Sequence, residues 1–298
     1  MKIISPVLLG LSLAVAGSTL TAAQSAPSTS TLPKILQITV EYTKPYKGGA
    51  AHDKTESAFI AAETRAKFPV YYVAMNALSG KSRALFMTHY DSFAEWEKDN
   101  KLVDANPALS AGLERAGLAD GELLDEVDQL VFTYDEDLSF HPHTDLDKHR
   151  VYQISVFHVR PGKQKEWREV VKMVKDAHEK AGTSAHWGMY EIAFGAPDGT
   201  FILLTGDPSM SAIDLGYSED TKFRDAIGGD EGMRKLDEKF GDAVESSRSE
   251  LFQVNPKQSY VSDDWIKADP EFWRPKAAVV PAAAPAAKPA SAAKMPTQ

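Results

Sequence analysis

Alternating apolar and polar residues predict a strand near the start of the chain, and the same pattern returns in the second half. Residues 36–41 read Leu-Gln-Ile-Thr-Val-Glu, and residues 152–157 read Tyr-Gln-Ile-Ser-Val-Phe. Successive side chains of a strand point to opposite faces, so each segment would carry one mainly apolar face. Lys-Pro and Arg-Pro follow the two segments, at 44–45 and 160–161. These echoes predict an internal repeat.

The segments that follow each strand extend the repeat. A helix is predicted at 164–181, where apolar residues recur at helical spacing up to Gly182. In the first half the pattern is weaker, and Asp53 with Glu56 could form a capping box at the start of the helix. Two strands with a tight turn follow in each half, then a helix and a last strand. The expected hairpins are 70–78 with 83–90 and 187–194 with 200–205, and the expected last strands are 130–134 and 251–254.

This order of elements, strand-helix-strand-strand-helix-strand repeated twice, resembles the ferredoxin-like dimeric α/β-barrel superfamily. That superfamily includes antibiotic-biosynthesis monooxygenases, NIPSNAP-type proteins, EthD-like proteins and the haem-binding chlorite dismutase group. The resemblance covers Leu36 to Pro256 and rests on element order, without a catalytic signature. It implies an α+β fold in which two tandem ferredoxin-like repeats close one barrel within one chain. Two domains that stay apart are the alternative, but open antiparallel sheets leave edges that need cover.

The two ends of the chain differ in composition from the middle. Residues 1–23 have a positive start, an apolar run and small residues before Gln24, as in a cleaved signal peptide. The expected organisation is a signal peptide at 1–23, a flexible lead-in at 24–34, a first repeat at 35–140, a linker at 141–150, a second repeat at 151–256, a C-terminal arm at 257–275 and a disordered tail at 276–298. We therefore expect a periplasmic or secreted protein with no integral membrane segment after cleavage.

Composition removes several classes of function. The 298 residues are 43% hydrophobic and carry a net charge of −9, with no cysteine. The acidic balance disfavours nucleic acid as a partner, since phosphate binding requires basic patches. Without cysteine there is no disulfide, so the fold must depend on its core. Nucleophilic-cysteine, phosphate-loop and dinucleotide motifs are missing from the sequence as well.

Polar residues of the predicted strands supply candidates for a pocket. If the apolar strand faces meet helices, the opposite faces line the space between the two sheets, which would suit a small organic ligand. The alternative is that these polar residues face solvent. The ligand-binding candidates are Gln37, Thr39, Asn76, Gln153, Ser155 and Trp187.

Three ionisable residues are weak candidates for catalysis. Glu41 and Glu191 would face each other between the sheets, and a carboxylate in an apolar lumen could serve as a general base. His89 alternates with apolar residues in the first hairpin. The plainer interpretations are two surface carboxylates and a histidine at the edge of the core.

The linker concentrates groups that can bind a cation. Residues 141–149 contain three histidines and two aspartates, yet no established zinc spacing, so a solvated connector is favoured and no metal site is assigned. His158 and His178 could be proposed as haem ligands by analogy with the haem-binding relatives, but no haem motif accompanies them. We expect no cofactor.

Two functions of different class remain open. The first is an exported module that binds a small organic molecule or a partner protein. The second is a cofactor-independent monooxygenase-like enzyme, as the resemblance implies. An enclosed apolar pocket that contains a buried histidine, asparagine or glutamate would favour the enzyme.

Overall fold

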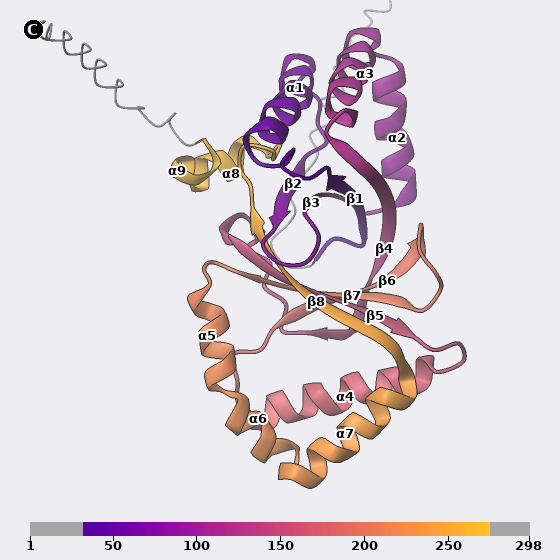
Figure 1. The fold of residues 1–298 in the computed structure, drawn as a ribbon, viewed down its shortest axis with the longest axis vertical. Coiled ribbons are helices and arrows are strands. Elements are labelled where there is room, and N and C mark those ends of the chain that lie inside the picture. Colours follow the sequence, from indigo (N-terminus) through magenta and orange to yellow (C-terminus); the bar gives the residue numbers. More distant parts are fainter. Residues whose placement is uncertain (1–31, 275–298) are drawn as a thin grey trace, which may run out of the picture.

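The alternating segments form the strands of a closed antiparallel barrel in the computed structural model, which describes residues 32–274 (Figure 1). The strands are β1 (Ile35–Thr43), β2 (Tyr72–Ala77), β3 (Arg83–Tyr90), β4 (Leu124–Phe140), β5 (Val151–Val159), β6 (Trp187–Phe194), β7 (Thr200–Asp207) and β8 (Val244–Val254). They follow one another around the barrel in the order β1-β3-β2-β8-β5-β7-β6-β4. The expected closure of one barrel within the chain is therefore confirmed.

Each half of the chain supplies four adjacent strands. The first half-sheet has the order β4-β1-β3-β2 and the second has the order β8-β5-β7-β6. The last strand of each half pairs with the hairpin of the other, β4 with β6 and β8 with β2. Because β4 and β8 reach across in this way, they extend well beyond the short last strands that the sequence predicted. Neither half-sheet is left with an open edge.

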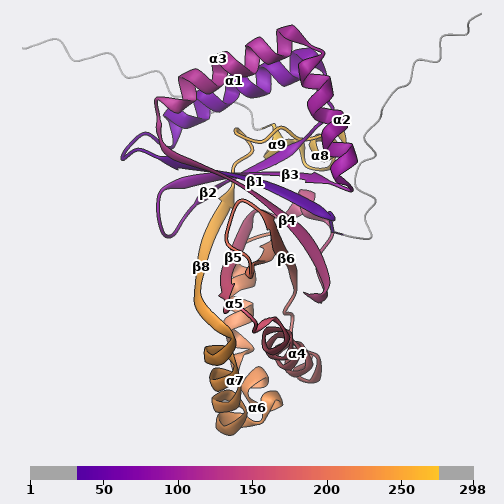
Figure 2. The same ribbon diagram turned by 90° about the vertical axis from the view of Figure 1, so that its right-hand side faces the viewer.

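Helices cover the outer face of each half-sheet. The first half carries α1 (Ala50–Ala66), α2 (Phe93–Asp104) and α3 (Pro107–Gly121), and the second carries α4 (Gln164–Ala181), α5 (Ser211–Ser218), α6 (Asp220–Ile227) and α7 (Gly229–Ala243). Figures 1 and 2 show these two groups at opposite ends of the molecule, with the barrel between them. Helix α4 has the expected bounds. Helix α1 begins three residues before the predicted cap Asp53, and Glu56 is buried within it instead of closing a capping box.

The apolar strand faces point into the barrel, where both half-sheets meet in one core. Side chains of Ile38, Ile154 and Phe252 belong to this cluster, and each is at most 6% exposed. The opposite faces point outward, toward the helices; this face is polar on β1, whereas on the second half-sheet it includes Phe157, Met189 and Leu203. The assignment of faces behind the predicted pocket is therefore reversed, because burying the apolar sets of two sheets against each other removes more apolar surface from water.

The linker and the C-terminal segment both pack against the barrel. His149 is 3% exposed, next to the short 3₁₀ turn η1 (Leu146–Lys148), so the linker is not simply a solvated connector. After β8, Tyr260 pairs with Tyr72, and helices α8 (Asp263–Ala268) and α9 (Pro270–Trp273) lead to the buried Trp273. Arg150 joins these two segments through an ion pair with Asp269 at 2.6 Å.

The expected signal peptide, most of the lead-in and the tail lie outside residues 32–274 and stay predictions. Leu32 and Pro33, which were expected in the flexible lead-in, line a cavity at the end of the barrel. Within the described residues, no helix combines the length and the apolar character needed to cross a bilayer.

Candidate functional site

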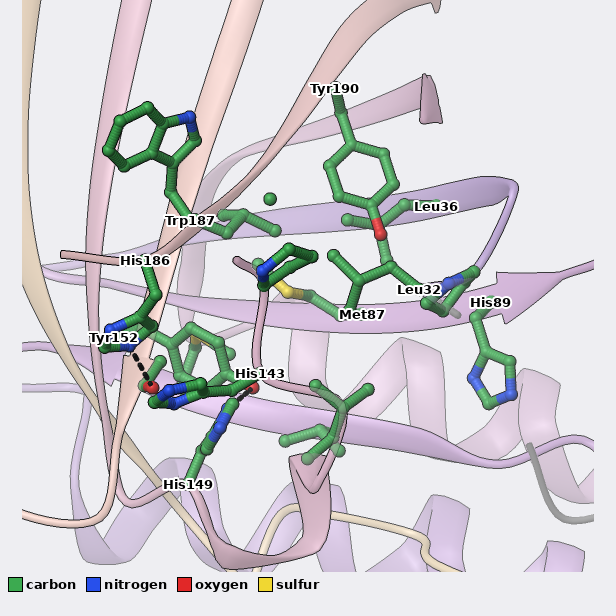
Figure 3. A pocket seen from close by; sticks show the side chains of 18 of the residues that line it. Leu32, Leu36, Met87, His89, His143, His149, Tyr152, His186, Trp187 and Tyr190 are labelled. Carbon is green, nitrogen blue, oxygen red and sulfur yellow. Dashed lines mark hydrogen bonds between the residues drawn. The ribbon is translucent and has the colours of Figure 1, made fainter. Parts of the chain in front are cut away.

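Trp187, one of the predicted ligand-binding residues, lines three cavities, two in the second half and one that residues of both halves enclose. The first, called here the α4–α7 cavity, has a volume of about 460 Å³ and lies between these two helices and the second half-sheet. The second, the α5 groove, has a volume of about 640 Å³. The third, the barrel-end cavity, has a volume of about 90 Å³ (Figure 3). Trp187 lines all three, and its indole N–H donates to the carbonyl of Leu138 at 2.9 Å.

The walls of the α4–α7 cavity are largely apolar. Helix α4 directs Trp167, Val170 and Val171 toward the sheet, because these positions share one face of the helix. Other lining residues are Phe157, Val174, Met189, Leu203, Leu236 and Phe240. The size falls within the range of about 300–1,000 Å³ that is typical of pockets for small organic ligands.

Three residues with polar groups interrupt these apolar walls, namely Trp167, His178 and Asp237 of α7. Trp167 is 2% exposed, and its indole N–H is a buried donor without an acceptor among the described residues. His178 lines both the α4–α7 cavity and the α5 groove, and its Nδ1 lies 2.8 Å from Thr183 Oγ1. Burial lowers the pKa of His178, although Glu219 and Asp220 act in the opposite direction. The imidazole is therefore neutral at neutral pH and can accept a proton.

The barrel-end cavity is small and is lined by several histidines. Figure 3 shows His143, His149 and His186 on one side of it and His89 on the other. Its volume of about 90 Å³ lies well below the range of about 300–1,000 Å³ that is typical of pockets for small organic ligands. The rings of His143 and His186 stack with their centres 3.7 Å apart, and His149 Nδ1 lies 3.0 Å from the Tyr152 hydroxyl. This cavity suits water or a very small molecule.

Burial keeps the innermost of these histidines neutral. It lowers the pKa of His149 to about 4, and Asp145 opposes this effect. Gly206 makes this position possible, because a Cβ there would collide with the His149 ring. Ligand atoms of His143, Asp145 and His149 lie within 4.8 Å of one another, which is close enough for a shared metal ion. The linker cluster noted in the sequence is thus partly assembled, although His143 and Asp145 are exposed.

The predicted pair of facing carboxylates is wrong. Glu41 points out of the barrel toward α1, where its Oε2 lies 3.0 Å from His52 Nε2. Glu191 is half-buried beside Arg168 of α4, in the other half of the molecule; burial raises its pKa and Arg168 opposes that rise. The cause is the reversal of faces, since the polar sides of the two half-sheets diverge instead of converging.

The other predicted residues are scattered. Gln37, Thr39 and Asn76 share the outward strand face of Glu41, as the pairing of β1, β3 and β2 requires. Ser155 bonds to Ser249 across the strand pair at 2.6 Å, while Gln153 lines the α5 groove. His89 lies in the wall of the barrel-end cavity, and burial lowers its pKa. Only Trp187, Gln153 and His89 of the nine candidates belong to the walls of these three cavities.

Sequence reasoning missed a cluster of buried ionisable residues in the first half. Glu41, His52, Glu56 and Asp120, called here the His52 cluster, meet between β1, α1 and α3. Burial opposes charge on His52, but its hydrogen bonds with Asp120 and Glu41 outweigh that effect and raise its pKa to about 10. Burial and the neighbouring carboxylates Glu41 and Asp120 raise the pKa of Glu56 to about 9. The i,i+4 spacing of His52 and Glu56, in a helix with a weak apolar pattern, was the available signal.

No model of a known protein family matches this sequence, and a search of curated proteins finds no match either. Several solved structures are similar to the chain. A proposed monooxygenase from Fusobacterium nucleatum subsp. nucleatum is 13% identical and has a TM-score of 0.48, with 74% of this chain and 92% of that chain covered. An anthrone oxidase-like protein is 12% identical, with a TM-score of 0.47 and 76% and 93% covered. A mutant chlorite dismutase from Candidatus Nitrospira defluvii is 8% identical, with a TM-score of 0.45 and 80% and 96% covered.

Proposed function

We propose that this protein binds a small, largely apolar organic molecule that carries one oxygen acceptor. The observation that carries the proposal is the α4–α7 cavity, with about 460 Å³ of space inside apolar walls and one buried, unpaired N–H donor on Trp167. Buried polar groups in proteins are nearly always hydrogen-bonded, and an unpaired one costs about 1–3 kcal/mol. A small rotation of the indole would bring this N–H, which has almost no accessible surface in the structure, to a carbonyl or hydroxyl oxygen of the ligand, while the rest of the ligand would cover the apolar walls.

The order of strands supports a related proposal, that the two halves are copies of one ferredoxin-like unit. Each half-sheet has its last strand at one edge and the first strand of its hairpin at the other, and the two seams join these same edges. The halves would then have diverged in what their helices cover. In that case the ligand cavity belongs to the second copy alone.

Binding can be tested on the full chain with a matched pair of ligands. The two-ring ketone 1-tetralone has an apolar body and one carbonyl, whereas tetralin has the same rings without the oxygen. Calorimetric titration should show tighter binding of 1-tetralone than of tetralin, by about tenfold, because one added hydrogen bond contributes about 1–1.5 kcal/mol. Val174→Trp would fill the cavity and should abolish binding of both ligands. Lys172→Trp, which places the same side chain on the exposed face of α4, should leave binding unchanged. If 1-tetralone bound Val174→Trp as tightly as it binds the wild-type chain, the proposal would be overturned.

A second candidate is the cofactor-independent oxygenase, and the observation that favours it is the imidazole of His178, which lines the α4–α7 cavity and lies 2.8 Å from Thr183 Oγ1. When Nδ1 carries the hydrogen and donates it to Thr183 Oγ1, Nε2 is the atom that can take a proton from a substrate carbon. The resulting carbanion can reduce dioxygen directly. For an activated methylene the balance is R₂CH₂ + O₂ → R₂C=O + H₂O, so the substrate supplies the electrons and no further reductant is needed.

Anthrone, whose methylene group is acidic, is a direct probe for this activity. The wild-type chain should speed the conversion of anthrone to anthraquinone. The rate is measured as oxygen consumption and as the change in absorbance. His178→Gln keeps a side chain that can bond to Thr183 but removes the base, so the rate should fall by about 10²–10⁴-fold. Binding of 1-tetralone should survive in this variant. Wild-type turnover equal to that of His178→Gln would exclude the catalytic role and leave the binding proposal standing.

A further inference from the structure

The His52 cluster has the composition and spacing of a metal site, although none of its members lines the cavities described above. One imidazole and three carboxylates approach one another beneath α1 and α3. His52 Nε2 lies 3.0 Å from Glu41 Oε2, 3.4 Å from Asp120 Oδ1 and 3.7 Å from Glu56 Oε1. Each of the four residues offers one ligand atom, and these atoms all lie within 4.8 Å of one another.

The three distances from His52 Nε2 are close to the edge of a small coordination tetrahedron. Metal–ligand bonds of about 2.1 Å to nitrogen and oxygen place the corners of a tetrahedron about 3.4 Å apart. The three distances from Nε2 average close to that edge. Four side chains could therefore close around one ion with only small movements.

One member of the cluster, Glu56, points into it without a hydrogen-bond partner among the residues that the structure describes. Glu56 is 3% exposed, and its Oε1 is buried with no hydrogen-bond donor among residues 32–274. Within the same residues, His52 is the one cationic side chain at ion-pair distance from the three carboxylates. A buried carboxyl oxygen without a hydrogen-bond partner is costly, and a bound cation would satisfy it.

Neighbouring side chains contact two members of the cluster, Asp120 and His52. The Thr55 hydroxyl donates to Asp120 Oδ1 at 2.6 Å, and the amide of Gln258 lies 3.4 Å from His52 Nδ1. Gln258 is fully buried, and its Oε1 has no partner. With the oxygen of this amide toward the ring, Gln258 would accept the Nδ1 hydrogen and leave Nε2 free to bind a metal. Such outer partners are typical of histidine ligands.

We propose that Glu41, His52, Glu56 and Asp120 bind one divalent transition-metal ion, and that Zn²⁺ fits the geometry. A set of one nitrogen and three oxygen ligands at tetrahedral spacing suits Zn²⁺. Mg²⁺ demands octahedral coordination and Ca²⁺ takes six to eight oxygen ligands, so both should bind poorly. Glu41 is the most exposed member, with 14% of its side chain accessible, and marks the side from which the ion would enter.

The test uses the full chain. Because the site is buried, the chain is unfolded in the presence of a chelator to remove metal and is then refolded with Zn²⁺. Bound zinc is then counted after dialysis, and the Zn²⁺-dependent rise in melting temperature is measured. Glu56→Gln keeps the shape of the ligand but removes its charge. Loss of an outer partner already costs 10–100-fold in affinity, so this variant should lose at least about 100-fold. His143→Gln is the control, since it disrupts the second group of possible ligands, in the linker.

The results separate clearly. One zinc ion per chain that disappears in Glu56→Gln and persists in His143→Gln supports the proposal, and Mg²⁺ should not replace it. Zinc that is lost only in His143→Gln places the ion in the linker and overturns the proposal. No retained zinc after refolding of the wild-type chain overturns it as well. Glu56→Gln should still bind 1-tetralone, so this outcome is independent of the proposed ligand cavity.

Discussion

The two helix-covered faces of the barrel differ in the kind of side chain that their helices bury. On the first half-sheet, α1 buries His52, Glu56 and Glu63, and charged groups take the place of an apolar stripe. On the second, α4 buries Trp167, Val170 and Val171 and leaves about 460 Å³ of space beside α7. The first interface therefore buries ionisable groups at an electrostatic cost, whereas the second is apolar and incompletely filled.

This difference indicates where each half can act. Buried ionisable groups are stabilised only by partners such as hydrogen bonds, shared protons or a cation, so the first interface favours ion chemistry. An unfilled apolar interface loses dispersion contacts that a ligand can restore, so the second favours an organic molecule. The barrel between them contains the apolar core that both half-sheets share, with the small barrel-end cavity at one end.

Of the substitutions that test this difference, we expect one at Glu63, in the first half, to have the largest effect on the free energy of unfolding. Glu63 is 7% exposed and accepts a hydrogen bond from the Tyr72 hydroxyl at 3.2 Å. Burial raises its pKa to about 8, an effect that the Tyr72 hydrogen bond partly offsets. The folded chain therefore binds a proton that the unfolded chain has lost, and stability falls as pH rises from about 4.5 through 8. Glu63→Gln removes this penalty and keeps an acceptor for Tyr72.

We expect Glu63→Gln to match the wild type within about 1 kcal/mol at pH 5 and to exceed it by about 2–4 kcal/mol at pH 9, at roughly 1.4 kcal/mol per pKa unit. Urea unfolding at pH 5, 7 and 9 measures the difference. The control is Glu122→Gln, which removes an exposed carboxylate at the end of α3. A difference that does not change with pH would show that Glu63 is not buried as an acid.

Much of the architecture could be predicted from the sequence because it depends on local periodicity. The helix 164–181 has a continuous apolar stripe and a terminal glycine, and its bounds are those of α4. The direction of each strand face could not be read in the same way. Alternation separates two faces but does not say which one meets helices, and here the packing of Ile38 against the other half-sheet decides it.

The candidate site was harder to predict because its members meet only through tertiary packing. Trp187 was identified from its place on a strand, whereas Trp167 lay within the helix predicted at 164–181 and was not a candidate. His178 was considered for haem alone. The His52 cluster combines β1, α1 and α3, and Asp120 lies far from His52 along the sequence. No spacing rule within a single segment could have joined them.

The smallest expected effect comes from the same substitution in the second half, at Glu191. Its carboxylate is half-buried beside Arg168, and the main partner of Arg168 is Asp135, at 2.6 Å. Since Glu191 lines none of the three cavities, Glu191→Gln should change the free energy of unfolding by less than about 0.5 kcal/mol and leave 1-tetralone binding unaltered. The measurements are urea unfolding and calorimetric titration at pH 7, with Glu63→Gln run beside it. If Glu191→Gln instead weakened binding, the site would extend to the Arg168 side of the second half-sheet, and the division between a charged first face and an apolar second face would be wrong.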